Sequence, residues 1–123
     1  MRLKITVNGQ KLIGELRDTE TAQRLLELLP FQSGLTRWGD EIYFSAPIKA
    51  SLEKDAKQVV NKRDICYWTS GGAVCIFFGP TPVSEGDECR AYEKVNVLGK
   101  IVKGDLGALK HTKTGDKVKV EKT

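Results

Sequence analysis

Short segments with apolar residues at every second position recur along this chain, and turn-forming residues separate them. At the N-terminus Leu3, Ile5 and Val7 alternate with polar residues, a pattern typical of a half-buried strand. The Asn-Gly pair at 8–9 suits the positive φ angles of a two-residue hairpin turn, and residues 10–16 form the expected return strand. Because such segments bury their apolar face only within a sheet, the pattern predicts a mainly β structure.

The remaining segments are short and are interrupted by glycine and proline. We expect further strands at residues 41–44, 59–60, 64–69, 73–78 and 95–102, and a last strand that buries Val118 and Val120. A first short helix begins at Thr19 or Asp18 and ends at Pro30, which cannot donate the next backbone hydrogen bond. A second covers residues 105–110. Many short strands with two short helices are typical of a barrel or a sandwich.

The segments 64–69 and 73–78 predict a hairpin around Ser70-Gly71-Gly72. If Gly71 and Gly72 form a two-residue turn, Trp68 lies opposite Cys75. One face of this hairpin then carries Cys66, Trp68, Cys75 and Phe77. The other face carries Ile65, Tyr67, Ile76 and Phe78. One face must fill the barrel, and the other is free to line a cleft.

Length and composition favour a single domain over residues 1–123, because a second core would have too few residues. No apolar stretch approaches the length of a membrane span, and the alternating N-terminus does not resemble a signal peptide, so we expect a cytoplasmic protein without membrane contact. The net charge of +4 is spread among alternating Lys and Asp/Glu residues, which argues against a nucleic-acid partner. Abundant Lys and Glu with few Asn and Gln are typical of a thermophilic source.

Several site types lack their sequence pattern. Cys66, Cys75, Cys89 and His111 do not have the paired short spacings of a zinc site, so we expect no metal. We expect Cys66 and Cys75 to be diagonal neighbours, buried and reduced. The glycines follow neither phosphate-loop spacing, and we expect no cofactor.

Residues 96–110, in which Gly99 and Gly104 bracket a strand and its turn into a helix, resemble the late strand-turn-helix of cyclophilins. Over nearly the whole chain, a closer similarity is carried by residues 38–45, 67–68, 75–82 and 95–101. These segments resemble a family of small cyclophilin-like proteins from archaea and bacteria. The resemblance implies a closed cyclophilin-like β-barrel with two short helices, and a family known for its fold and not for a function.

Cyclophilins isomerise Xaa-Pro bonds with a buried arginine from a Phe-His-Arg motif. In the comparable stretch, residues 42–47, this chain has neither arginine nor histidine. Val95 stands where cyclophilins carry a pocket histidine, and the single histidine, His111, follows the last helix. Arg37, Arg63 and Arg90 are the candidates to replace the missing arginine. Arg37, beside Trp38, is the best of the three, although an exposed salt bridge is the more usual role for such a residue.

Seven of the nine aromatic residues fall between Trp38 and Phe78. Most of them are expected in the core. A second interpretation is an apolar cleft with a few polar anchors, formed by Trp38, Glu41, Tyr43, Trp68 and Thr81, with Arg37 beside it. Glu41 is in that case a carboxylate among aromatic rings, whereas at the surface it would pair with a lysine.

The sequence therefore favours a domain that binds a small molecule or a peptide in an aromatic cleft. Prolyl isomerisation is the alternative, and assembly through a homo-oligomer is the third hypothesis.

Overall fold

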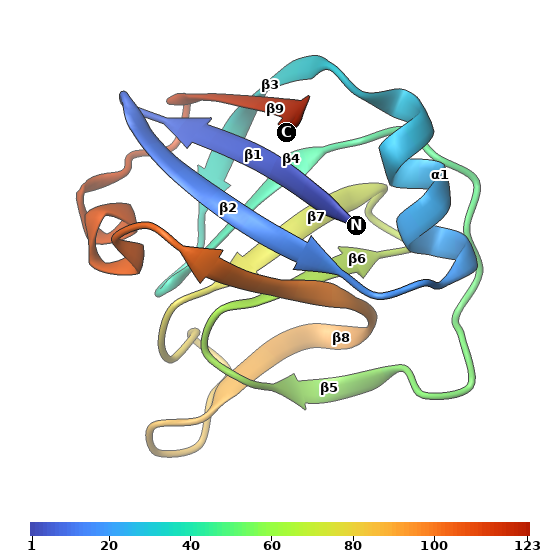
Figure 1. The fold of residues 1–123 in the computed structure, drawn as a ribbon. Helices are drawn as coiled ribbons and strands as arrows, with labels where there is room; N and C mark the ends of the chain where they lie inside the picture. Colours follow the sequence, from blue (N-terminus) through green and yellow to red (C-terminus); the bar gives the residue numbers. More distant parts are fainter.

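The computed structural model describes all residues, 1–123, and Figure 1 shows their arrangement. The chain forms nine strands and two short helices. The strands are β1 (Arg2–Val7), β2 (Gln10–Leu16), β3 (Phe31–Arg37), β4 (Glu41–Ser45), β5 (Lys57–Val60), β6 (Asp64–Trp68), β7 (Ala73–Phe77), β8 (Cys89–Lys103) and β9 (Lys117–Lys122). The helices are α1 (Glu20–Leu28) and the 3₁₀ helix η1 (Leu106–His111). Neither helix is long and apolar enough to cross a membrane.

The strands form one antiparallel sheet that closes on itself. Its order is β2-β1-β9-β3-β4-β7-β6-β8-β5, and an additional pairing joins β2 to β8. This pairing closes a ring from which only β5 is left out, because β5 pairs with β8 alone. The predicted mainly β fold is confirmed, and the strands do close a ring. The ring departs from a regular barrel through register shifts in the pairings of β8 with β2 and with β6.

Strand β8 is much longer than the predicted strand, which began at residue 95. Its first part, residues 89–95, pairs with β5. Its second part, residues 96–103, pairs with β6 on one side and β2 on the other. We call β5 together with residues 89–95 the flap. This antiparallel pair lies outside the ring, at the bottom of Figure 1. Its start escaped sequence analysis because residues 92–94 are all exposed and show no alternation.

The N-terminal hairpin is as predicted. Asn8 and Gly9 have φ angles of 50° and 78°, and Val7 pairs with Gln10 across the turn. In β1, Leu3, Ile5 and Val7 are buried inside the ring. Local sequence therefore determines both the turn and the face of β1 that packs inward.

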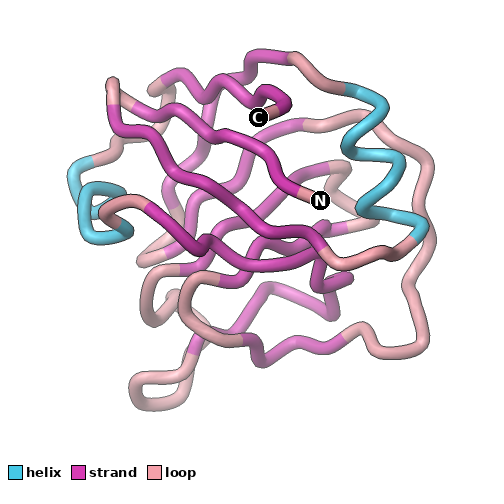
Figure 2. Tube along the Cα trace, in the orientation of Figure 1, coloured by secondary structure: helices cyan, strands magenta, loops and turns pink.

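Both predicted helices are present. The Thr19 hydroxyl caps α1 by accepting a hydrogen bond from the Ala22 amide at 3.2 Å, and the helix ends before Pro30. Asp105 caps η1 in the same way at Gly107. Figure 2 shows the two helices on opposite sides of the ring. Leu106 and Leu109 bury the apolar side of η1 against the core.

The hairpin of β6 and β7 corrects the predicted register. Trp68 pairs with Ala73, so four residues form the loop, and Cys66 lies directly opposite Cys75 instead of diagonal to it. The longer loop follows from local packing, because the Trp68 ring occupies the space where a Cβ of Gly71 would lie. The register moves by an even number of residues, so the two predicted faces are preserved.

These two faces belong to two separate apolar clusters. Ile65, Tyr67, Ile76 and Phe78 belong to the main core, which receives residues from every strand of the ring. The opposite face belongs to a smaller cluster of Val60, Cys66, Cys75, Phe77, Cys89, Ala91 and Val95. Because Val60, Ala91 and Val95 come from the flap, this second cluster lies between the flap and the outer face of the ring.

Closure of the ring requires glycine at position 99. A Cβ on Gly99 would lie 2.8 Å from the Leu16 Cα and would also meet the Glu15 carbonyl across the β2–β8 pairing. We expect Gly99→Ala to lower the free energy of unfolding by about 1–3 kcal/mol, because neither backbone can move without opening the ring. Chemical denaturation measures this change. Gly34→Ala is the matched control in β3, where a Cβ meets nothing within 4 Å, and an equal loss in both variants would contradict the explanation.

Candidate functional site

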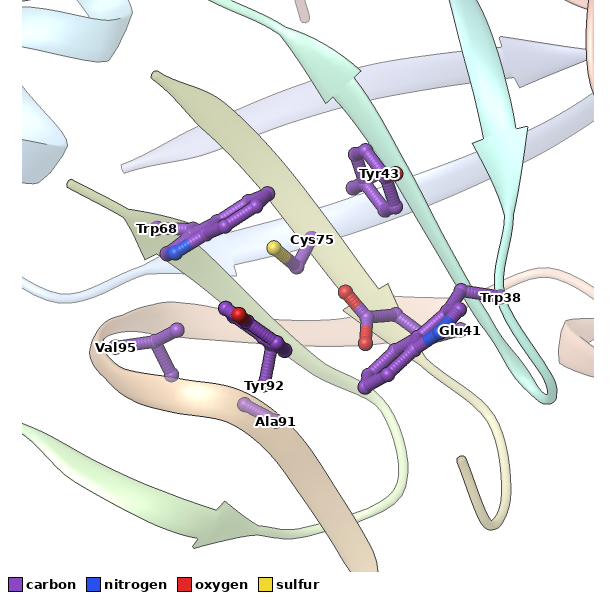
Figure 3. Close-up of a pocket in the computed structure, with 8 residues that line it drawn as sticks. All are labelled: Trp38, Glu41, Tyr43, Trp68, Cys75, Ala91, Tyr92 and Val95. Carbon is purple, nitrogen blue, oxygen red and sulfur yellow. The ribbon is translucent and has the colours of Figure 1, made fainter. Parts of the chain in front are cut away.

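A pocket of about 260 Å³ lies between the flap and the outer face of the ring (Figure 3). The ring contributes Trp38, Glu41, Tyr43, Trp68 and Cys75. The flap contributes Ala91, Tyr92 and Val95. Seven of the eight lining residues are hydrophobic, and Glu41 is the exception. Four of the six residues proposed from sequence therefore do come together: Trp38, Glu41, Tyr43 and Trp68.

The ring side of the pocket is set by strand alternation and one tight turn. Glu41 and Tyr43 are two residues apart on β4, so both point outward. Tyr43 pairs with Cys75 on β7, which places this thiol beside them. Trp38 is brought to the same end by a two-residue turn, in which its amide donates to the Glu41 carbonyl at 2.9 Å. Gly39 makes this turn possible with a φ of 61°.

The four aromatic rings of the pocket stand nearly perpendicular to their neighbours. Tyr43 and Trp68 meet at an interplanar angle of 85° with ring centroids 5.7 Å apart. Tyr92 meets Trp68 at 68° and 5.8 Å, and it meets Trp38 at 76° and 6.3 Å. Edge-to-face contact is a preferred arrangement of aromatic pairs and fixes the orientation of each ring. The four rings that line the pocket thus lie in steeply inclined planes.

Trp68 is also held from outside the pocket. Its indole N–H donates a hydrogen bond of 2.6 Å to Glu93 Oε1, which also accepts one from the Ser70 hydroxyl. These two donors lower the pKa of Glu93 and keep its carboxylate ionised beside the pocket. The indole plane therefore has one defined position.

Glu41 is the one acidic group inside the pocket, and one of its two carboxyl oxygens has no hydrogen-bond partner. The residue is only 4% exposed, and its Oε1 atom makes no hydrogen bond. In Figure 3 its carboxyl group points into the space among the rings and the Cys75 side chain. Burial away from water raises the pKa of Glu41 to about 7, and the Cys75 thiol opposes this rise only in part. The surface pairing with lysine considered from sequence is thereby excluded.

Arg37 lies outside the pocket and links the turn at 38–41 to the end of η1. Its guanidinium pairs with Asp40 at 3.1 Å and donates to the Lys110 and Thr112 carbonyls at 3.0 and 3.1 Å. It also lies over the Phe78 ring, 5.0 Å from the centroid. These contacts use the donor groups of the Arg37 guanidinium, so the role of this residue is structural. No arginine lines the pocket. The pocket therefore lacks the guanidinium that cyclophilins use.

Thr81 also lies outside the pocket. It is buried in the loop after β7, where its hydroxyl donates to the Arg90 carbonyl at 2.5 Å. This bond ties the loop to the start of β8. The hydroxyl was expected to anchor a ligand, but it holds the backbone at the base of the flap.

Sequence reasoning missed the flap residues and Cys75. Tyr92 is 65% exposed and lies outside the aromatic-rich stretch, so nothing local connects it with Trp38 and Trp68. Val95 could have been included from sequence, since it stands where cyclophilins carry a pocket histidine. Cys75 was assigned to the correct face of β7, and only the flap that covers this face was missing.

The three cysteines are free and buried, and burial raises the pKa of each thiol. No group of three or more His, Cys, Asp or Glu side chains is arranged to hold a metal ion. The chemistry that the pocket offers is therefore one carboxyl group among aromatic faces.

The comparisons with known proteins agree with this fold. The sequence model described as Cyclophilin-like matches residues 1–121. The chain is also similar to a hypothetical protein of Archaeoglobus fulgidus with a known solution structure, and the two sequences are 38% identical. That match has a TM-score of 0.85 and covers 100% of this chain and 95% of the other. No curated protein matches the chain. The chain belongs to the cyclophilin-like family, as the resemblance predicted, and the function of this family is unknown.

The buried carboxyl group predicts an unusual pH dependence of stability. Below pH 4.5 Glu41 is protonated in both the folded and the unfolded chain and costs nothing. As the pH rises from 4.5 to about 7, only the unfolded chain ionises, so folding stability falls and then stays level. At 1.36 kcal/mol for each pH unit, the loss is about 3 kcal/mol.

Glu41→Gln should remove this loss and be more stable than the parent chain at pH 8, by an amount that shrinks toward pH 4.5. Urea denaturation across this pH range measures it. Glu27→Gln, at an exposed position on α1, is the control and should leave the pH profile unchanged. Parallel profiles for the parent chain and Glu41→Gln would refute the burial of an ionisable Glu41.

Proposed function

We propose that this protein is a binding domain that holds a small molecule, or one side chain of a peptide, in the pocket between the flap and the ring. The observation that carries the proposal is the buried Glu41 Oε1 atom, which has no hydrogen-bond partner in a pocket whose other lining residues are hydrophobic. A buried polar group without a hydrogen bond lowers stability, and a ligand that supplies the partner would relieve this cost. Ligand sites commonly combine an apolar lining with a few polar groups of this kind.

The order of the aromatic side chains supports the same proposal. Trp68 is fixed by Glu93 on one side and by Tyr43 and Tyr92 on the other. A site whose side chains are already in place loses little conformational entropy when it binds. The pocket therefore has the preorganised lining of a binding site.

The flap gives the pocket an access route. Tyr92 is the most exposed large hydrophobic residue of the chain, and it closes the pocket between the two tryptophans. A rotation of this one side chain would widen the entrance without disturbing the core. Binding therefore does not require the ring to open.

An amide NMR titration with a fragment library tests the proposal. We expect fragments that bind to shift the resonances of Trp38, Glu41, Tyr43, Trp68 and Tyr92 together, because all five lie around one cavity. Mass spectrometry of the purified protein under native conditions is a second readout, for a ligand carried through purification.

Tyr92→Ala removes one wall without touching the buried core and should weaken such fragments, while Tyr92→Phe retains the ring and should not. Leu52→Ala is a matched surface control, since Leu52 is exposed and does not line the pocket. Shifts confined to residues outside the pocket would overturn the proposal.

A further inference from the structure

We propose that the ligand of this pocket carries an alkylated ammonium group, such as a trimethylammonium head group, bound between the aromatic rings and the Glu41 carboxylate. This inference rests on the proposed function and names its ligand class. It combines two independent features of the pocket: the arrangement of the rings and the absence of any internal cation.

The rings form a partial cage. Tyr43, Trp68, Tyr92 and Trp38 follow one another with centroid spacings of 5.7, 5.8 and 6.3 Å and steep interplanar angles. All four rings line the same cavity, and their planes are steeply inclined to one another. A cation within about 6 Å of a ring face is attracted by the ring quadrupole, most strongly by tryptophan. Alkyl groups on the ammonium add apolar contact with the same faces.

Glu41 supplies the charge that makes the cage selective. Its Oε1 is buried and unpartnered, and its carboxyl group points into the space among the rings (Figure 3). No lysine, arginine or histidine lines the pocket, so an ionised Glu41 has no counterion within it. A ligand cation would be this counterion. An alkylated ammonium is also less strongly hydrated than a bare one, so it enters an apolar pocket at lower cost.

The volume also suits such a ligand. At about 260 Å³ the pocket can take a head group with a short chain and leaves no room for a large ring system. The Glu93 carboxylate accepts the Trp68 indole N–H at 2.6 Å and adds a second negative charge beside this pocket residue. Both acidic groups favour a cation over an anion.

Fluorescence titration tests the inference directly, because the chain has two tryptophans and both line the pocket. The probes are tetramethylammonium, choline and dimethylbutanol, the uncharged isostere of choline in which a tert-butyl group replaces the trimethylammonium group. We expect choline to bind roughly tenfold or more tightly than its isostere, since the two differ only in the interaction with charge and π-faces. Calorimetry with the same ligands provides a second measurement.

Two variants separate the parts of the cage. Glu41→Gln should weaken choline at least about tenfold at pH 8 and leave the isostere unchanged, because only the cation uses the charge. Tyr92→Leu should weaken choline roughly three- to tenfold, whereas Tyr92→Phe should retain its affinity. Leu52→Ala should change neither ligand.

Choline affinity should also rise with pH. Burial raises the pKa of Glu41 to about 7, so its ionised fraction, and with it the affinity, rises about tenfold between about pH 6 and about pH 8. The other titratable groups that line the pocket are the Tyr43 and Tyr92 phenols and the Cys75 thiol. Burial raises the pKa of the Cys75 thiol well above its ordinary value, so Glu41→Gln should abolish the pH dependence.

The outcomes distinguish this inference from the proposed function. Equal or tighter binding of the isostere would overturn the ammonium inference and leave the binding proposal standing. The ammonium inference alone also fails if choline and tetramethylammonium do not bind while library fragments shift the pocket resonances. If no fragment shifts them, both ideas fall together.

Discussion

The structure depends on the change of partners that β8 makes at Val95 and Asn96. Before this point the strand pairs with β5 in the flap, and after it the strand closes the ring between β6 and β2. Asn96 is fully buried there, and its amide group is satisfied on both sides. Its Oδ1 accepts from the Glu53 amide at 2.8 Å, and its Nδ2 donates to the Ser51 carbonyl at 2.9 Å and the Thr21 hydroxyl at 3.2 Å. Because a buried amide with unmet hydrogen bonds is costly, this network holds the strand, helix α1 and the loop at 51–53 in one arrangement.

The flap turns the outer face of the ring into a second interior. A ring of strands packs its core on one side and normally presents its other side to water. Here β6 and β7 are covered on both sides, and their residues are almost all buried. The pocket is the part of this second interior that side chains do not fill. Its position follows from where the flap places Tyr92 and from where the turn at 38–41 brings Trp38.

Glu41 is an energetically costly residue in this pocket. An isolated carboxyl group among aromatic rings is tolerated because it can remain protonated near neutral pH. A residue that costs stability and meets no structural need is typical of a functional site. Arg37, by contrast, makes enough contacts with its own chain to explain its presence by structure alone.

Local sequence determined most of the elements of this protein, although β3 and the first part of β8 were not predicted, and only the tertiary structure decided how the elements form a pocket. Alternation, the Asn-Gly turn, the Thr19 cap and Pro30 predict strands, hairpin and helix boundaries, because each depends on neighbours a few residues away. Which side chains of the β6–β7 hairpin share a face was also predictable, since successive side chains of a strand point to opposite faces whatever the register. The segments that cover these faces were not predictable, because β5, Tyr92 and Val95 are brought near Trp68 only by the long-range strand pairings of β8. Trp38, Glu41, Tyr43 and Trp68 were recognisable by composition, whereas the roles of Arg37 and Thr81 depended on backbone carbonyls that no side-chain pattern encodes.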